Sequence, residues 1–270
     1  MNWARHFPLV CVLLFHSLAA HGKTRAPLGF RPPLDFIVVL DPGHGGQDTG
    51  ALYKEGPPGK STLYTEKALT LLIAKDLARE LIIRGYQVVL TRNDDRDTHL
   101  TDRTAMANKV KANIFISIHL NSTPELNGAH GIETFILNHA TDASSRRLAD
   151  LENSVLKESQ ANEAGKSSNV SLIMKDMILD ANLTPSKALA CAIQNNLKKG
   201  TKNRGVRQAL FYVLLGADMP SVLIEAGFMN SKEDRERALN PLTRQRLVNQ
   251  IAGAVEDFRL KKTSTSGKVV

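Results

Sequence analysis

Short apolar runs alternate with amphipathic segments along the chain. The apolar runs predict buried strands, and the amphipathic segments predict helices that each turn one face to a core. The predicted strands are residues 36–40, 86–91, 114–118, 132–137, 210–214 and 221–224, and the predicted helices are residues 66–84, residues 101–111 and a segment that begins at Pro241. This alternation predicts an α/β fold with a mostly parallel twisted sheet flanked by helices.

One long segment, residues 140–184, interrupts the alternation. Two amphipathic stretches, around Leu148 and Ile173, are separated in it by a polar break, and a further helix is expected to open near Pro185. A connection of this length in a compact domain is typical of a lid or a regulatory element. We therefore predict a helical insertion, with a surface decoration as the alternative.

The N-terminal residues have the pattern of an export signal. Arg5 supplies a positive charge, a mostly apolar stretch covers residues 7–15, and small residues follow around Ala19. This predicts a signal peptide at residues 1–20, with a buried N-terminal helix as the alternative. The proline-containing segment 21–35 is expected to be a linker. The apolar stretch is too short to span a bilayer, so no transmembrane segment is expected in the mature chain.

Charge and composition narrow the classes of partner. The formal net charge is +8, and aromatic residues make up 5% of the chain. The basic residues, including a basic tail at 261–270, have no aromatic platform beside them, which argues against nucleic-acid binding. Attraction to an anionic polymer or membrane surface and simple solubility explain the charge equally well. Only Cys191 lies outside the expected signal, which excludes an internal disulfide in the mature chain.

Three predicted strands lead directly into polar residues with metal or acid–base chemistry. The first runs into a glycine-rich loop with His44, the second into His119 and the third into Glu225. In an open α/β sheet, ligands bind beyond the carboxyl ends of the strands, so these groups are expected to converge in one crevice. Two histidines and a carboxylate suit a catalytic zinc ion and its general base. Taken singly, His119 and Glu225 also fit structural roles.

Glu66 is a further candidate ligand. It shares a helix face with Leu69 and Ile73, and that face is expected to point into the core. A buried carboxylate needs a partner, and zinc would supply one. The alternative is a partly solvated glutamate favoured by the dipole of the helix N-terminus.

Several motifs of the sequence, taken together, resemble those of a known family. They are residues 39–46, 66–67, 117–121 and 220–228, with further matches at 100–108 and 131–135. Residues 36–258 resemble the zinc-dependent N-acetylmuramoyl-L-alanine amidases, bacterial cell-wall hydrolases, and in particular their periplasmic cell-separation type. The resemblance implies that residues 36–260 form a zinc amidase domain. It also implies that His44, Glu66 and His119 bind zinc and that Glu225 is the catalytic glutamate.

The resemblance also implies a substrate and a mode of control. The reaction would be hydrolysis of the amide bond between N-acetylmuramic acid and the L-alanine of the stem peptide of peptidoglycan, in the periplasm or otherwise at the cell wall. Some relatives carry a helical insertion that covers the zinc site until a protein activator displaces it, and residues 140–184 are similar in place and character. Either Glu152 or Glu158 could then block the metal, and Glu152 is favoured because Glu152 and Asn153 resemble the family's insertion.

Two other functions remain open. A secreted zinc peptidase that acts on a peptide terminus would use the same kind of metal site. No particular arginine in the sequence is singled out as its clamp for a substrate carboxylate. A non-catalytic wall-binding or activator protein with a decayed site would have lost a ligand or the base, whereas all four candidate residues are present.

Overall fold

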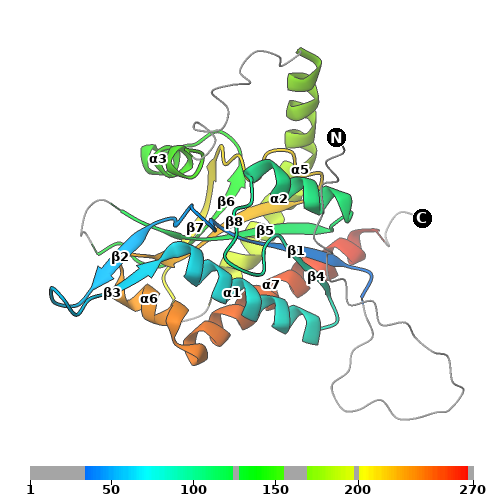
Figure 1. The fold of residues 1–270 in the computed structure, drawn as a ribbon. Coiled ribbons are helices and arrows are strands. Elements are labelled where there is room, and N and C mark those ends of the chain that lie inside the picture. Colours follow the sequence, from blue (N-terminus) through cyan, green and yellow to red (C-terminus); the bar gives the residue numbers. More distant parts are fainter. Residues whose placement is uncertain (1–33, 124–127, 155–168, 198–200, 267–270) are drawn as a thin grey trace, which may run out of the picture. The chain divides into compact units, whose positions relative to one another are not determined.

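A six-stranded sheet with the strand order β4-β1-β5-β8-β6-β7 forms the centre of the fold (Figure 1). The computed structural model describes residues 34–123, 128–154, 169–197 and 201–266. The expected signal peptide and nearly all of the expected linker lie outside these residues. The strands are β1 (Ile37–Pro42), β4 (Gln87–Leu90), β5 (Ile114–Asn121), β6 (Ile132–Leu137), β7 (Asn203–Ala209) and β8 (Ser221–Phe228).

The direction of the strands changes once across the sheet. Strands β4, β1, β5 and β8 run parallel to one another, as the sequence pattern predicts. Strand β6 pairs antiparallel with β8, and β7 runs parallel to β6 at the edge of the sheet. The carboxyl ends of β1, β5 and β8 therefore lie at the same end of the sheet as the amino ends of β6 and β7.

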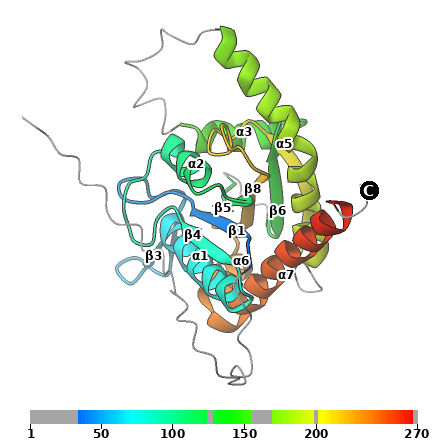
Figure 2. The same cartoon turned by 90° about the vertical axis from the view of Figure 1, so that its right-hand side faces the viewer.

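Helices cover both faces of this sheet (Figure 2). Side chains of α1, α5 and α7 pack against one face, where Leu77, Ile193 and Val248 are fully buried. Side chains of α2 and α3 pack against the other face, through Ala107 and Leu148. The helices are α1 (Glu66–Ile83), α2 (Leu100–Lys109), α3 (Ala143–Glu152), α5 (Asn169–Asn196), α6 (Lys232–Leu239) and α7 (Pro241–Ser266). The α/β fold class is confirmed.

A small antiparallel hairpin, β2 (Leu52–Glu55) and β3 (Thr62–Thr65), joins the loop after β1 to α1. Among the described residues, no helix combines the length and the apolar composition needed to cross a bilayer.

The prediction of a strand at 210–214 was wrong. These residues form turns, in which the amide of Leu214 donates to the carbonyl oxygen of Phe211 at 3.0 Å. The edge strand β7 is the more polar segment that precedes them. Phe211, Val213 and Leu214 are apolar because the turn packs into the core on the α2 and α3 face. Apolar composition reports burial and does not distinguish a buried turn from a buried strand.

The predicted start of a helix near Pro185 was also wrong. Helix α5 begins at Asn169 and continues through Pro185 to Asn196. Proline removes a backbone hydrogen bond from a helix interior. The C-terminal part of α5 is nevertheless anchored, because Leu189 and Ile193 are fully buried. The segment 140–184 thus contains α3 and the first part of α5, and the residues between these helices lie outside the described part of the chain.

Candidate metal and catalytic site

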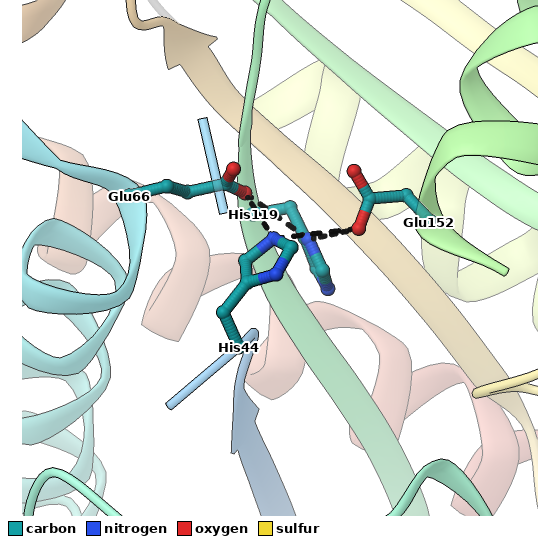
Figure 3. Close-up of side chains that lie close together, drawn as sticks. All are labelled: His44, Glu66, His119 and Glu152. Atoms are coloured by element: carbon teal, nitrogen blue, oxygen red, sulfur yellow. Dashed lines mark hydrogen bonds and ion pairs between the residues drawn. The ribbon is translucent and has the colours of Figure 1, made fainter. Parts of the chain in front are cut away.

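Four side chains meet at the carboxyl ends of the parallel strands (Figure 3). They are His44, Glu66, His119 and Glu152, and one potential ligand atom of each lies within 4.8 Å of all the others. His44 follows β1, His119 lies on β5, Glu66 begins α1 and Glu152 ends α3. The tertiary structure therefore brings the three predicted metal ligands together and adds a fourth side chain.

The glycine-rich loop after β1 holds the His44 ring with one nitrogen toward this cluster. Nε2 lies 3.0 Å from Oε1 of Glu66 and 3.4 Å from Oε2 of Glu152. Nδ1 is 2.8 Å from a carboxylate oxygen of Asp48, so when the ring is neutral its proton lies on Nδ1 and the lone pair of Nε2 is available to a metal. The His44 backbone has φ 60°, a left-handed conformation that is uncommon outside glycine.

Glu66 is oriented by backbone amides and is almost fully buried. Oε1 accepts a hydrogen bond from the amide of Leu120 at 3.0 Å, and Oε2 accepts one from the amide of Ala51 at 2.9 Å. The side chain is only 2% exposed, so the alternative of a partly solvated glutamate is wrong. Oε1 also lies 3.2 Å from Nδ1 of His119, which places this oxygen between the two imidazole rings.

Two glycines allow the close approach of these side chains. A Cβ atom at Gly43 would lie 2.5 Å from the His119 ring. A Cβ atom at Gly50 would lie 2.6 Å from both Oε2 of Glu66 and the His44 ring, and Gly50 has φ +61°. Any larger residue at these positions would displace a candidate ligand.

Two buried arginines donate hydrogen bonds to the backbone of the loop that contains His44. Sequence reasoning missed their role. Arg103 donates to Asp41 and to the carbonyl oxygen of His44. Arg92 donates to the carbonyl oxygens of Pro42 and Gly43. Although burial alone would raise the pKa of Asp41, Arg103 and hydrogen bonds hold it below its usual value. The signal in the sequence was Arg103 itself, within the family-like segment 100–108.

Helix α3 carries the fourth side chain into the cluster. Oε2 of Glu152 lies 3.1 Å from Nδ1 of His119, and the side chain is 14% exposed. Of the two glutamates considered from the sequence, Glu152 lies in this cluster. Glu158 lies outside the described residues.

Glu225 lies beside the cluster, on β8, in register with His119 on β5. The side chain is fully buried, and neither carboxylate oxygen has a hydrogen-bond partner among the described residues. Burial raises the pKa of Glu225 well above its ordinary value, and the carboxylates of Glu66, Glu152 and Glu133 raise it further. Such a shift is common at functional sites, where an acid has to hold its proton near neutral pH.

The electrostatics of the cluster favour a cation at its centre. Burial lowers the pKa values of His44 and His119, but the carboxylates of Glu66 and Glu152 outweigh burial and raise both to about 10. The same imidazoles lower the pKa of Glu66 below its usual range, against the effect of burial. Two imidazole nitrogens and two carboxylate oxygens are a donor set that zinc accepts in proteins. The residues therefore fit a divalent metal ion, which would replace the imidazole protons.

Comparison with known proteins supports the same conclusion. The family described as N-acetylmuramoyl-L-alanine amidase matches residues 38–257. The chain is 31% identical over 226 residues to N-acetylmuramoyl-L-alanine amidase AmiA of Escherichia coli K12, covering 82% of this chain and 75% of AmiA.

Solved structures of amidases have the same fold. An N-acetylmuramoyl-L-alanine amidase from Clostridium difficile 630 matches with a TM-score of 0.60 and 30% identity, covering 83% of this chain and 96% of that one. The CwlD amidase from Clostridioides difficile, solved in complex with the GerS lipoprotein, matches with a TM-score of 0.58 and 25% identity, covering 83% and 98%. With the family match over most of its length, the chain belongs to the N-acetylmuramoyl-L-alanine amidase family.

Proposed function

We propose that this protein is a zinc-dependent amidase of peptidoglycan. It hydrolyses the amide bond between N-acetylmuramic acid and the L-alanine of the stem peptide. The observation that carries the proposal is the convergence of His44, Glu66 and His119 beside the buried Glu225. Family membership and relatives such as AmiA support the amidase activity itself.

The three ligands would hold the metal in the arrangement of two histidines and one glutamate that many zinc hydrolases use. A bound zinc ion supplies Lewis acidity and makes water nucleophilic at neutral pH. Backbone amides fix the Glu66 carboxylate, and Asp48 fixes the tautomer of His44. These contacts orient the ligands before the metal arrives.

Glu225 is proposed as the general acid and base. Burial and the neighbouring carboxylates raise its pKa well above the ordinary value, which increases the affinity of the carboxylate for a proton. Such a group can accept a proton from the attacking water and donate one to the nitrogen of the leaving L-alanine. Its position on β8, one strand from His119, places it next to the proposed ligands.

Residues 140–184 are proposed to keep the enzyme inactive at rest. Glu152 fills the fourth position of the cluster, where a catalytic metal needs an open site for water. Helix α3 is docked through buried Leu148 and Ala149. At its C-terminal end, the side chain of Asn153 donates to the carbonyl oxygen of Leu210 at 2.7 Å and accepts from the amide of Tyr212 at 2.8 Å. Displacing α3 from the cluster requires these contacts to break.

A protein activator is proposed to supply the energy for that movement. The matched structure of CwlD contains the GerS lipoprotein, so a relative of this fold is known to bind a protein partner. We further propose export through a signal peptide at 1–20, a linker at 21–35, the amidase domain at 36–260 and action on the cell wall, in the periplasm or outside.

The experiment is digestion of purified peptidoglycan by the zinc-loaded protein, with the soluble products identified by mass spectrometry. Wild-type protein, Glu152→Gln and Glu225→Ala are compared. Release of intact stem peptides with free L-alanine amino groups is expected from Glu152→Gln, at a severalfold lower rate from wild type, and not from Glu225→Ala. Cleavage between amino acids with the sugar–peptide bond intact would instead identify a peptidase. No cleavage by Glu152→Gln, despite bound zinc, would overturn the proposal.

A further inference from the structure

A row of charged side chains extends from the candidate metal site to the edge of the sheet. Glu225 on β8 is the register partner of His119 on one side and of Glu133 on β6 on the other. Side chains of directly paired residues point to the same face of a sheet. The row therefore crosses β5, β8 and β6 and reaches toward β7, the edge strand.

Glu133 holds two arginines of β7 at the end of this row. It is almost completely buried and forms ion pairs with Arg204 and with Arg207, whose Nε lies 3.6 Å away. The Arg204 guanidinium also lies over the ring of Phe228, 5.0 Å from its centroid, and Phe228 follows Glu225 by three residues. Both arginine side chains remain about a quarter exposed. One buried carboxylate thus orients two partly accessible guanidinium groups.

The N-terminal end of helix α3 places a second carboxylate on Arg207. Nη1 of Arg207 donates to Oδ2 of Asp142 at 3.2 Å. Asp142 is the N-cap of α3, and its side chain also accepts from the amide of Ser145. Glu152, at the other end of α3, lies in the candidate metal cluster. The same helix therefore presents one carboxylate to the candidate metal ligands and another to Arg207.

The charges of the two arginines and their two carboxylate partners allow one further anion to bind when α3 is displaced. Glu133 balances one of the two guanidinium charges, and Asp142 balances the other. The Nε of Arg207 is buried and has no hydrogen-bond partner among the described residues. Guanidinium groups bind carboxylates with paired, charge-assisted hydrogen bonds. Loss of Asp142 would leave one guanidinium charge of this pair without a balancing carboxylate.

We propose that Arg204 and Arg207 bind a carboxylate of the peptide part of the substrate, and that Asp142 occupies this subsite at rest. The proposal rests on the proposed amidase function, because it assigns the peptide side of that substrate. Strands β5 and β7 are three strand spacings apart, about 14 Å. An extended peptide covers that span in about four residues. A carboxylate of the stem peptide about four residues from the scissile amide bond is therefore within reach.

The test compares two soluble N-acetylmuramoyl peptides that differ only in their peptide carboxyl groups, free in one and amidated in the other. Rates of cleavage are measured at limiting substrate in the Glu152→Gln background, alone and combined with Arg207→Gln or Arg207→Lys. We expect the Glu152→Gln protein to cleave the compound with free carboxyl groups about tenfold or more faster than the amidated compound, as a charge-assisted hydrogen bond allows. Arg207→Gln abolishes the preference by slowing cleavage of the acid only, and Arg207→Lys retains part of it.

Binding provides a readout that does not depend on turnover. Calorimetry measures the affinity of both compounds for full-length Glu225→Ala protein, with Asp142→Asn as the added change. Asparagine still caps a helix but removes the charge, so Asp142→Asn is expected to tighten binding of the acid and to leave binding of the amide unchanged.

A purely structural ion-pair network makes different predictions. Arg207→Gln would then lower the cleavage of acid and amide equally, and Asp142→Asn would change the affinity for neither compound. Either result overturns the subsite. Arg79→Gln, an exposed arginine on α1, is the matched control and changes neither rate. Failure of the proposed function is recognised separately, because neither compound would be cleaved at its sugar–peptide bond while carboxylate-dependent binding persisted.

Discussion

Asp48 accepts a hydrogen bond from Nδ1 of His44 at 2.8 Å, four residues along the same loop. The opposite nitrogen, Nε2, is thereby left to face Glu66. A carboxylate behind a metal-binding histidine fixes the orientation of its ring and raises its basicity. Asp48 was not considered from the sequence, where it is one polar residue in a loop.

Asp48→Ala is expected to weaken zinc binding by about 10- to 100-fold without unfolding the protein. Competition with a chromophoric chelator measures the affinity, and thermal unfolding of the metal-free protein monitors the fold. Asp35→Ala is the control, because Asp35 is an exposed aspartate just before the N-terminal end of β1. Equal zinc affinity in Asp48→Ala and wild type would contradict the role of this hydrogen bond.

Metal binding is expected to release protons. In the metal-free protein the pKa values of His44 and His119 are raised to about 10, so both imidazoles are protonated at pH 7. Ligation requires neutral imidazole, so zinc displaces about two protons at that pH. Calorimetric titration of zinc in buffers of different ionisation enthalpy counts them. A heat that is independent of the buffer would show that the imidazoles are neutral before binding.

The same pKa values predict how the stability of the metal-free protein depends on pH. The folded-state values lie above the ordinary value of 6.5 for histidine, so the stabilising contribution is complete below pH 6.5. It is lost as the pH rises through about 10, because the folded state then loses its extra protons. The unfolding temperature in chelator should therefore fall between pH 7 and pH 10. Zinc-loaded protein is the comparison, since its imidazoles carry no such proton.

Substitution of the two glutamates separates a ligand from a base. Glu225→Gln is expected to retain one zinc per chain and to lose at least about 100-fold in kcat, the usual contribution of general acid–base catalysis. Glu66→Gln is expected to lose zinc as well as activity, because it removes a charged donor between the imidazoles. Metal content by atomic absorption and turnover of peptidoglycan are measured on the same samples. Loss of zinc in Glu225→Gln would assign Glu225 as a ligand instead.

Gly50→Ala tests the packing behind the cluster. Its Cβ would lie 2.6 Å from Glu66 and His44, so the substitution should displace both side chains and weaken zinc binding. The left-handed backbone adds a conformational cost of about 1 kcal/mol. Gly59→Ala is a close control, because Gly59 has φ +79° and no heavy atom of the described structure lies within 4 Å of its Cβ position. Both variants should lose stability, and only Gly50→Ala should lose affinity for zinc.

Glu152→Gln tests the proposed block. Glutamine keeps the shape of the side chain but is a much weaker metal ligand than a carboxylate, so basal cleavage of peptidoglycan should rise severalfold while zinc content is unchanged. Asp150→Asn, an exposed carboxylate on the same helix, should leave the basal rate as it is. A basal rate in Glu152→Gln equal to that of wild type would argue that α3 does not restrain the enzyme.

Local sequence patterns were enough to predict which segments are buried and which polar residues follow them. The runs before His44, His119 and Glu225 are strands as predicted, because continuous burial on both faces makes a parallel strand apolar throughout. The helical spacing of Glu66 with Leu69 also predicted its burial correctly. These are local patterns, and each depends only on neighbouring positions in the chain.

The contacts that these segments make depend on tertiary packing. The turn at 210–214 has the composition of a strand because both are buried, and only hydrogen bonding distinguishes them. The reversed direction of β6 and β7 depends on long-range strand pairing. It brings Glu133 and Arg207 to the same side of the sheet as His119. The approach of Glu152 depends on how α3 docks. A sequence pattern records the burial of a side chain, whereas its partner is set by the packing of segments far apart in the chain.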